Sequence, residues 1–495
     1  MTLDPRTPVL VGVGQITDRP APGARFAERP TPLSLMVEAL RRAGADAGGR
    51  VLDDLDELVA IRSFVWHTAD PARLVADELG LEVTRTRHTA TGGNTPQQLV
   101  HEYSRRIAAG ELHAVAVVGA EAMHARSLAR REGVETGWVV QSEGDTLEHP
   151  LEEERSPLTG AEFAAGLTMP TDIYPLFENA RRARLGESAY EQRSRLGRLW
   201  ASFARVAATN PHAWITDGPS AEVIATPSPT NRLIGSPYTK FLVANMPVDM
   251  GAAFVLTSYE YATSRGVARD QMVFPHAGAD ASDHWFVSDR PTLDDSPAMR
   301  AIWRFLGDAG VRADRLAHLD LYSCFPTVVQ TACEIAGFDP FDPTRPATVT
   351  GGLTFGGGPG NNYVTHSIAA MVERLRAHPG DEGLVTGLGW FSTKHAWGTY
   401  STTPPAQGFV HQNVQDIVDA GPRTQIRGGD GEAVVETYTV VHNRAGEPER
   451  LVLGARWETG ERTWAKGTDP SVLARFTEGA PFDERVTLRD GVVVA

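Results

Sequence analysis

The chain has 495 residues, of which 41% are hydrophobic, enough for roughly two to four domains with large buried cores. Its formal net charge is −15, from 62 acidic and 47 basic residues, which argues against nucleic acid or an anionic membrane surface as the main partner. No run approaches the roughly 20 uninterrupted apolar residues of a membrane span. No secretory leader is expected either, because residues 1–6 carry charge and the apolar run that follows is short. The expected compartment is therefore the cytoplasm.

Cysteines and histidines give no sign of a metal centre or a disulfide framework. Cys324 and Cys333 are too few for a disulfide scaffold or a four-ligand zinc site, and buried thiols are the simplest interpretation. His284 and His395 stand alone in the sequence, which is more typical of core or surface histidines than of ligands. No metal site and no bound cofactor are expected.

Strand and helix patterns alternate along the N-terminal part of the chain. A β-rich run at 8–15 is followed by the helical stripe Leu33, Met36, Val37 and Leu40. A strand at 58–62, a helix at 95–109 and a buried strand at 114–119 continue the series. Such alternation predicts a mostly parallel sheet covered by helices.

The same alternation is used a second time after residue 245. The expected elements are a strand at 252–257, a strand at 272–274, a helix at 298–309, a strand at 319–322, a helix at 327–336 and a strand at 384–387. Between the two series lies an irregular region that includes a helix at 189–209. It is expected to be an insertion over one end of the sheet, where α/β proteins commonly place ligand contacts.

The pattern changes after Pro405. Strands are predicted at 433–441 and 449–457 around a turn at 443–446, with a helix near 470–476 and a final strand at 485–494. This is compatible with a small β-rich domain of the OB-barrel type. The predicted domains are 1–125, 126–245, 246–403 and 404–495.

Two glycine-containing segments are candidates for ligand contact. Thr89–Pro96 precedes a predicted helix, so its backbone N–H groups form a potential anion or oxyanion site, although a helix start with Thr95 as the cap explains it equally well. In Thr350–Tyr363, seven of the ten residues from Gly351 to Gly360 are Gly or Pro. Glycine lets the backbone of a loop come close to a ligand, so this composition favours a functional loop over a merely tight connection.

A third candidate is the segment Tyr322–Pro326, which follows the predicted strand 319–321. The carboxyl end of a strand is where open α/β sheets hold catalytic groups. Tyr322 is interpreted in one of two ways. It is either an acid, a base or a hydrogen-bond donor to a carbonyl oxygen, or it is a packed aromatic residue. Cys324 has no histidine nearby in sequence to activate it, so a core thiol is favoured over a nucleophile.

The order of several motifs resembles the thiolase superfamily, and within it the sterol-carrier-protein type thiolases and the mycobacterial thiolase-like proteins. The resemblance covers residues 8–402. It implies two similar halves packed as a five-layered α/β/α/β/α core, with an insertion in the first half that binds coenzyme A. The motifs are Val11-Gly-Val-Gly14, Ala90-Thr-Gly-Gly93, Val117-Val-Gly-Ala-Glu-Ala-Met123, Thr209-Asn-Pro211, Val248-Asp-Met-Gly-Ala-Ala253, Tyr322-Ser-Cys-Phe325, Gly351-Gly-Leu353 and Gly357-Gly-Gly-Pro359.

The residues that carry thiolase chemistry are replaced in this chain. The position of the nucleophilic cysteine falls at Thr89, and the histidine of the Gly-His-Pro motif becomes Gly358. A second cysteine is expected near 385–389, where the sequence has none. The resemblance thus implies acyl-CoA as substrate or ligand, with no cofactor beyond it, and argues against an ordinary thiolase with a cysteine acyl-enzyme.

Tyr322 occupies the position of a thiolase oxyanion-hole histidine, and thiolase-like steroid side-chain aldolases, which act with an OB-like partner, also carry Tyr there. Their second Tyr is missing here, and Tyr363 or His366 would replace it only if the loop brings one inward. Backbone near the substrate-binding residues Gly92, Gly93, Asn94 and Gly357 is expected to hold the thioester oxygen.

Two hypotheses follow from the resemblance. The first is an enzyme of lipid metabolism that makes or breaks a carbon–carbon bond next to a CoA thioester. The second is a non-catalytic acyl-CoA-binding or scaffolding protein with a degenerate site. Because thiolases are usually dimers or tetramers, a homodimer is also implied, unless the extra C-terminal domain covers the usual interface.

Overall fold

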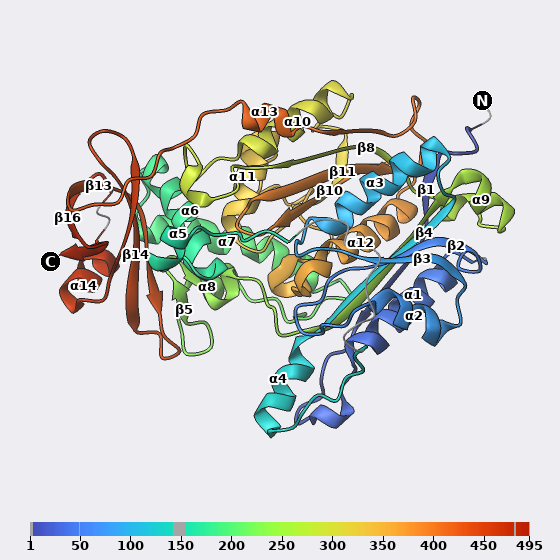
Figure 1. The fold of residues 1–495 in the computed structure, drawn as a ribbon, viewed down its shortest axis with the longest axis horizontal. Coiled ribbons are helices and arrows are strands. Elements are labelled where there is room, and N and C mark those ends of the chain that lie inside the picture. Colours follow the sequence, from blue (N-terminus) through green and yellow to red (C-terminus); the bar gives the residue numbers. More distant parts are fainter. Residues whose placement is uncertain (1–2, 49, 142–153, 480–481, 495) are drawn as a thin grey trace.

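Two mixed five-stranded sheets form the core of the protein in a computed structural model that describes residues 3–48, 50–141, 154–479 and 482–494 (Figure 1). The first sheet has the strand order β1-β7-β4-β2-β3. Its first two pairings are antiparallel, and only β4-β2 and β2-β3 are parallel. Its strands are β1 (Pro8–Thr17), β2 (Leu55–Ala60), β3 (Val83–His88), β4 (Ala114–Ala122) and β7 (Asp249–Ser258).

The second sheet has the order β12-β8-β11-β10-β9 and is also mixed, so the prediction of mostly parallel sheets is wrong. One reason is that only residues 390–393 separate β10 from β11, too few for the crossover that a parallel pair needs. The strands are β8 (Phe274–Ser282), β9 (Leu316–Asp320), β10 (Glu382–Gly389), β11 (Lys394–Ser401) and β12 (Val410–Asn413).

Helices lie on both outer faces and between the sheets. α3 (Thr95–Ala109) and α12 (Tyr363–Ala377) contact strands of both sheets and form the central layer. α1 (Pro32–Asp46) and α2 (Pro71–Leu79) cover the outer face of the first sheet, and α10 (Pro297–Asp308) covers the second (Figure 1). The expected five-layered α/β/α/β/α core is confirmed.

The strand predicted at 252–257 belongs to the first sheet and does not open the second. It lies inside β7, which pairs with β1 on one side and β4 on the other. Every residue of β7 is buried. A continuous apolar run indicates a central strand but carries no information on which sheet it joins, so the sequence pattern could not assign it.

The described part of the region between the two series contains several helices and two short strands. Its longest helix, α7 (Ala189–Ala207), begins with a Ser188 cap that accepts from the Glu191 N–H. Trp200 and Phe203 stack at 4.9 Å, and the Trp200 indole donates to Thr354 Oγ1 at 2.9 Å, which joins α7 to the glycine-rich loop. The other elements are α4 (Met123–Glu132), α5 (Gly160–Ala164), α6 (Pro170–Leu185), α8 (Ala221–Ala225), β5 (Leu233–Gly235) and β6 (Tyr238–Thr239), followed later by α9 (Tyr259–Ser264), α11 (Pro326–Ala336) and α13 (Gln415–Asp419).

The C-terminal domain is a closed five-stranded barrel, as the β-rich pattern indicated (Figure 1). Strands pair in the cycle β13-β14-β15-β17-β16-β13. The predicted final strand is two strands, because Asp490 (φ 50°) and Gly491 (φ 70°) form a left-handed turn. The elements are β13 (Gly431–His442), β14 (Pro448–Arg456), β15 (Arg462–Gly467), α14 (Pro470–Glu478), β16 (Arg485–Arg489) and β17 (Val492–Val494).

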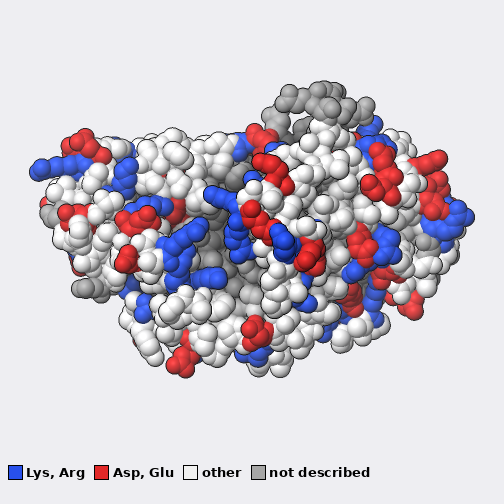
Figure 2. All heavy atoms as spheres, turned by 90° about the horizontal axis from the view of Figure 1, so that it is seen from below, with Lys and Arg blue, Asp and Glu red and all other residues white. Residues whose placement is uncertain are grey.

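Acidic and basic side chains alternate over much of the visible surface. Figure 2 shows one face on which several Lys and Arg side chains gather around a hollow near the middle. The net negative charge is therefore compatible with local basic edges that an anionic ligand could use. No helix in the described ranges combines the length and apolar character needed to cross a bilayer.

Candidate active site

A cavity of about 480 Å³ opens where β9 ends, and we call it the Tyr322 cavity. The loop Thr91–Gly93, the segment around Tyr322, the insertion and the end of the glycine-rich loop all contribute to its wall. Its lining is dominated by apolar side chains, among them Phe64, Leu158, Met169, Tyr174, Val243, Met246, Phe325, Leu353, Leu388, Trp390 and Phe391. A site of this size and polarity suits an organic ligand with an apolar part.

Tyr322 lies in this cavity with its hydroxyl against the Gly93 backbone. The Tyr322 N–H donates to Thr386 Oγ1 at 2.8 Å, and its ring meets the Tyr363 ring edge-on at 5.5 Å. A side-chain carbon on Gly93 would collide with the Tyr322 hydroxyl, so glycine is required at this contact. Burial raises the Tyr322 pKa well above its ordinary value. The hydroxyl therefore keeps its proton and can donate to a carbonyl oxygen.

The loop before α3 holds an anion, and that anion is a carboxylate of the chain itself. Glu154 Oε1 accepts from the Thr91 N–H and the Thr91 hydroxyl, both at 2.8 Å, and lies 3.2 Å from the Arg62 guanidinium. The Gly92 N–H donates to Asn361 Oδ1 at 2.9 Å. Thr95 is not the helix cap, because α3 already includes it and its hydroxyl donates to the Gly92 carbonyl. Thr91 thus donates two hydrogen bonds to a carboxylate of the chain itself, and binding of an external anion by this loop stays a prediction.

Removing the Glu154 carboxylate is expected to strengthen anion binding at this loop. In Glu154→Ala, the Thr91 N–H, the Thr91 hydroxyl and Arg62 lose their internal acceptor. If acetyl-CoA binds at this loop, as the superfamily resemblance implies, titration calorimetry should give an affinity roughly three- to tenfold higher than in the unchanged protein, about the worth of one ordinary hydrogen bond. Glu447→Ala, which removes an exposed glutamate of the barrel, is the control. Equal affinities in all three proteins would mean that Glu154 does not occupy a ligand position.

The glycine-rich loop serves mainly as a tight connection. Gly351 and Gly352 have φ values of 94° and 71°, and a Cβ on Gly351 would lie 2.5 Å from the Ala207 Cβ. Gly357 (φ 112°) packs on Met250 in the same way, and the Gly358 N–H donates to the Asn245 carbonyl at 3.0 Å. The loop segments that line the Tyr322 cavity are Leu353, Gly360 and Asn361.

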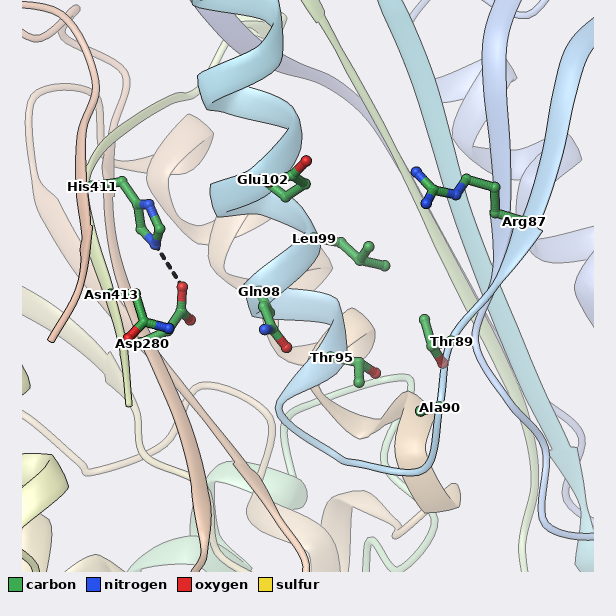
Figure 3. A pocket seen from close by; sticks show the side chains of 10 residues that line it. All are labelled: Arg87, Thr89, Ala90, Thr95, Gln98, Leu99, Glu102, Asp280, His411 and Asn413. Atoms are coloured by element: carbon green, nitrogen blue, oxygen red, sulfur yellow. Dashed lines mark hydrogen bonds and ion pairs between the residues drawn. The ribbon is translucent and has the colours of Figure 1, made fainter. Parts of the chain in front are cut away.

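Several residues singled out from the sequence do not line the Tyr322 cavity. Thr89 accepts from the Arg62 N–H at 3.1 Å and lines a second cavity on the other side of its loop (Figure 3). The Tyr363 hydroxyl bonds Thr350 Oγ1 at 2.7 Å. His366 contacts Gln15 at 2.9 Å, and burial lowers its pKa to about 3, so the ring is neutral. The loop does not turn Tyr363 or His366 inward.

Cys324 lines the cavity, but as a protonated thiol. Burial raises its pKa to about 12, and no histidine is among the residues that line the same cavity. Tyr174, the neighbouring side chain, donates to the Trp390 carbonyl at 2.8 Å and stacks on Phe325 at 4.3 Å. Thiolate chemistry therefore has no support from the described cavity wall.

Three polar residues near the cavity were not singled out from the sequence. Asn361 ties the glycine-rich loop to the first half, since its amide donates to the Arg62 carbonyl at 2.8 Å and its oxygen accepts from Gly92. Buried Lys394 donates to the Thr91 carbonyl at 3.0 Å. Glu121 lies behind Phe64 and accepts a hydrogen bond from its N–H at 2.6 Å. These residues come near the cavity through contacts between distant segments, which the sequence does not reveal. Only Asn361 could have been selected from the sequence, because it lies inside the glycine-rich motif.

Glu121 is expected to make stability depend on pH. Burial raises its pKa to about 7, against the partial compensation of hydrogen bonds from the Phe64 N–H and the Ser63 hydroxyl. Because the folded pKa exceeds the unfolded one near 4.5, the stabilisation is complete below about pH 4.5 and is lost as pH rises through about 7. The loss should amount to roughly 3 kcal/mol. Urea unfolding between pH 5 and 8 should show this slope, and Glu121→Gln should remove it; an unchanged slope in the variant would contradict the assignment.

Comparison with known proteins agrees with this geometry. The C-terminal residues 413–491 match the family model "Thiolase-like protein type 1 additional C-terminal domain". Among solved structures, a monomeric SCP2-thiolase-like protein type 1 from Mycobacterium smegmatis is 31% identical over 100% of both chains, with a TM-score of 0.83. None of the functionally curated proteins compared matches the chain.

Two more distant structures share the fold over four-fifths of the chain. They are the Ltp2-ChsH2(DUF35) aldolase, 19% identical with a TM-score of 0.58 over 80% of this chain and 98% of that one, and an acetyl-CoA acetyltransferase from Syntrophomonas wolfei, 15% identical with a TM-score of 0.56 over 80% and 99%. The two packed sheets and the site at their carboxyl edge define a thiolase-fold protein. With the M. smegmatis match over its full length, the chain belongs to the SCP2-thiolase-like proteins of the thiolase superfamily.

Proposed function

We propose that the protein binds an acyl-CoA thioester in the Tyr322 cavity and makes or breaks a carbon–carbon bond beside the thioester carbonyl, without an acyl-enzyme. The observation that carries the proposal is the protonated Tyr322 hydroxyl, held against Gly93 in an apolar cavity. A donor fixed in such surroundings stabilises an oxyanion more strongly than water does. The apolar lining suits the acyl part of the ligand.

A retro-aldol cleavage fits these groups with water as the proton carrier. The β-hydroxyl gives its proton to a water molecule, and its oxygen becomes a carbonyl as the bond between the α- and β-carbons breaks. The electron pair of that bond moves into the thioester, whose enolate oxygen accepts the Tyr322 hydrogen bond. The α-carbon then takes a proton back from the protonated water, so no proton is gained or lost overall, and the reverse sequence forms the bond. The aldolase among the structural neighbours supports this reaction class only through its shared fold.

The test is titration calorimetry with acetyl-CoA, a longer acyl-CoA and free CoA. We expect micromolar binding of acyl-CoA, with the longer acyl chain binding more tightly because it buries apolar surface in the cavity. Absence of heat with every CoA species at millimolar concentration would overturn the proposal.

A non-catalytic acyl-CoA-binding or scaffolding role is the second candidate. The contact of Glu154 with Thr91 favours it, because a side chain of the protein already occupies the anion-binding loop. Tight binding without turnover of any β-hydroxy or β-keto acyl-CoA would select this candidate. A homodimer remains a further proposal from the superfamily resemblance, and a light-scattering mass of one chain would overturn it.

A further inference from the structure

Three side chains from distant parts of the chain meet beside α3. His101 Nδ1 lies 3.0 Å from Asp280 Oδ1, and His411 Nε2 lies 2.6 Å from Asp280 Oδ2. The two imidazole rings are 5.0 Å apart. Within the described ranges, this is the one group of His, Cys, Asp or Glu that could hold a metal ion, with all ligand atoms within 4.8 Å of one another.

The group borders a second cavity, of about 410 Å³, which Figure 3 shows from close by. His411 and Asp280 point toward each other on one side of α3, and Arg87 reaches toward the same space from β3 on the other side (Figure 3). The loop that begins at Thr89 separates this cavity from the Tyr322 cavity, and the two share no lining residue. An ion held by the three side chains would therefore have an open side toward a polar space.

The sheet makes room for His101 at two glycines. A Cβ on Gly278 would collide with the His101 ring, and a Cβ on Gly398 would collide with Gln97, the partner of that ring. Gln97 is held in turn by Tyr400, whose hydroxyl donates to Gln97 Oε1 at 2.6 Å. A metal-bound histidine is usually oriented by such a hydrogen bond to its other nitrogen.

The charge at this place also favours a cation. Asp280 is 6% exposed, and a buried carboxylate is costly unless a positive charge compensates it. Two imidazoles on one carboxylate supply the nitrogen and oxygen donors that divalent transition metals prefer.

We propose that His101 Nδ1, the Asp280 carboxylate and His411 Nε2 bind one divalent transition-metal ion, with Zn²⁺ as the first ion to try. Zinc bonds of about 2.0–2.2 Å place neighbouring ligand atoms about 3.3 Å apart. The contacts of 3.0 and 2.6 Å must therefore open by less than 1 Å, and ligand atoms that now lie up to 4.8 Å apart must close by as much as about 1.5 Å. The proton of His101 then sits on Nε2. The side-chain amide of Gln97 flips so that its oxygen accepts a hydrogen bond from this Nε2–H, and its nitrogen donates to the Tyr400 hydroxyl. Water completes the coordination on the cavity side.

His411 gives this site a structural consequence. It lies on β12, in the segment that connects β11 of the core to the barrel, and pairs opposite Gly278 on β8. A metal ion would clamp this connecting segment onto α3 and β8. Because an ion that binds only the folded state stabilises it, zinc should raise the melting temperature.

The test uses the full chain after treatment with a chelator. Calorimetry with Zn²⁺ and the visible spectrum with Co²⁺ should show one ion per chain at micromolar or tighter affinity, with the strong bands of a four- or five-coordinate cobalt ion. His411→Gln should weaken binding by about 100-fold or more and abolish the zinc-dependent rise in melting temperature. His318→Gln removes a half-buried histidine that pairs with Asp381 at 2.9 Å elsewhere, and should bind like the unchanged protein.

Two results would overturn the proposal. No uptake of either ion by the unchanged protein would leave the three residues as a hydrogen-bonded network without metal. Equal affinity in His411→Gln would place the ion somewhere else. If His411→Gln is unfolded by circular dichroism, Asp280→Asn replaces it, because the amide keeps the volume of the carboxylate while removing its charge.

Discussion

Replacing Arg462 by methionine is expected to destabilise the protein by roughly 3–5 kcal/mol. Arg462 lies on β15 of the barrel and is fully buried. Its Nε and Nη2 donate to the Glu436 carboxylate at 2.7 and 2.8 Å. Its Nη1 donates to main-chain carbonyls of the core, at 2.8 Å for both Ser288 and Arg290. One guanidinium thus joins the barrel to the core. Methionine keeps the stem but removes the donor to the Ser288 and Arg290 carbonyls and leaves Glu436 with Arg456 as its remaining partner.

Urea unfolding followed by tryptophan fluorescence measures this effect, since Trp464 lies next to Arg462 and bonds Ser288 across the same junction. Arg475→Met is the matched control. Its ion pair with Glu484 has the same 2.7 Å distance, but both side chains are about half exposed, so the loss should stay below about 1 kcal/mol. Equal losses in the two variants would show that the barrel does not depend on the Arg462 junction.

Periodicity predicted those elements that bury one continuous apolar face. The stripe from Leu33 to Leu40 marks α1, and the apolar run at 114–119 lies inside β4. The strands β3 and β11 were missed because their sequences, Val-Thr-Arg-Thr-Arg-His and Lys-His-Ala-Trp-Gly-Thr-Tyr-Ser, mix polar and apolar residues. β3 lies at a sheet edge, where Thr84 and Arg85 are exposed to solvent. β11 is central but buries its polar groups in pairs such as Lys394 with Thr91.

The two candidate sites differ in how far sequence can predict them. Tyr322 could be placed because it lies two residues beyond the end of β9, and residues that follow a strand lie at the carboxyl edge of its sheet. The group of His101, Asp280 and His411 could not, since its members are separated by 179 and 131 residues and meet through tertiary packing alone. Glu154 at the Thr91 loop is hidden for the same reason.

Tyr322→Phe is expected to lower turnover by about 100- to 1,000-fold, the usual loss when one oxyanion donor is removed. Acyl-CoA affinity should change by less than about threefold, because the neutral thioester carbonyl forms a weaker hydrogen bond with the Tyr322 hydroxyl than the enolate oxygen does. The fold should persist, since phenylalanine keeps the edge-on contact with Tyr363 and the hydrogen bond from the main-chain N–H of residue 322 to Thr386.

Tyr363→Phe is the control that separates chemistry from packing. Its hydroxyl bonds Thr350 and lies 3.4 Å from both Asp320 oxygens, so its loss should cost about 1 kcal/mol of stability and leave turnover unchanged. Two measurements are made on each variant. Single-turnover cleavage of a β-hydroxyacyl-CoA gives the turnover, and calorimetric titration gives the acyl-CoA affinity. If Tyr363→Phe is the variant that loses turnover while Tyr322→Phe retains it, the oxyanion donor is misassigned. If binding falls in Tyr322→Phe as much as turnover does, the hydroxyl holds the substrate and has no selective part in the reaction.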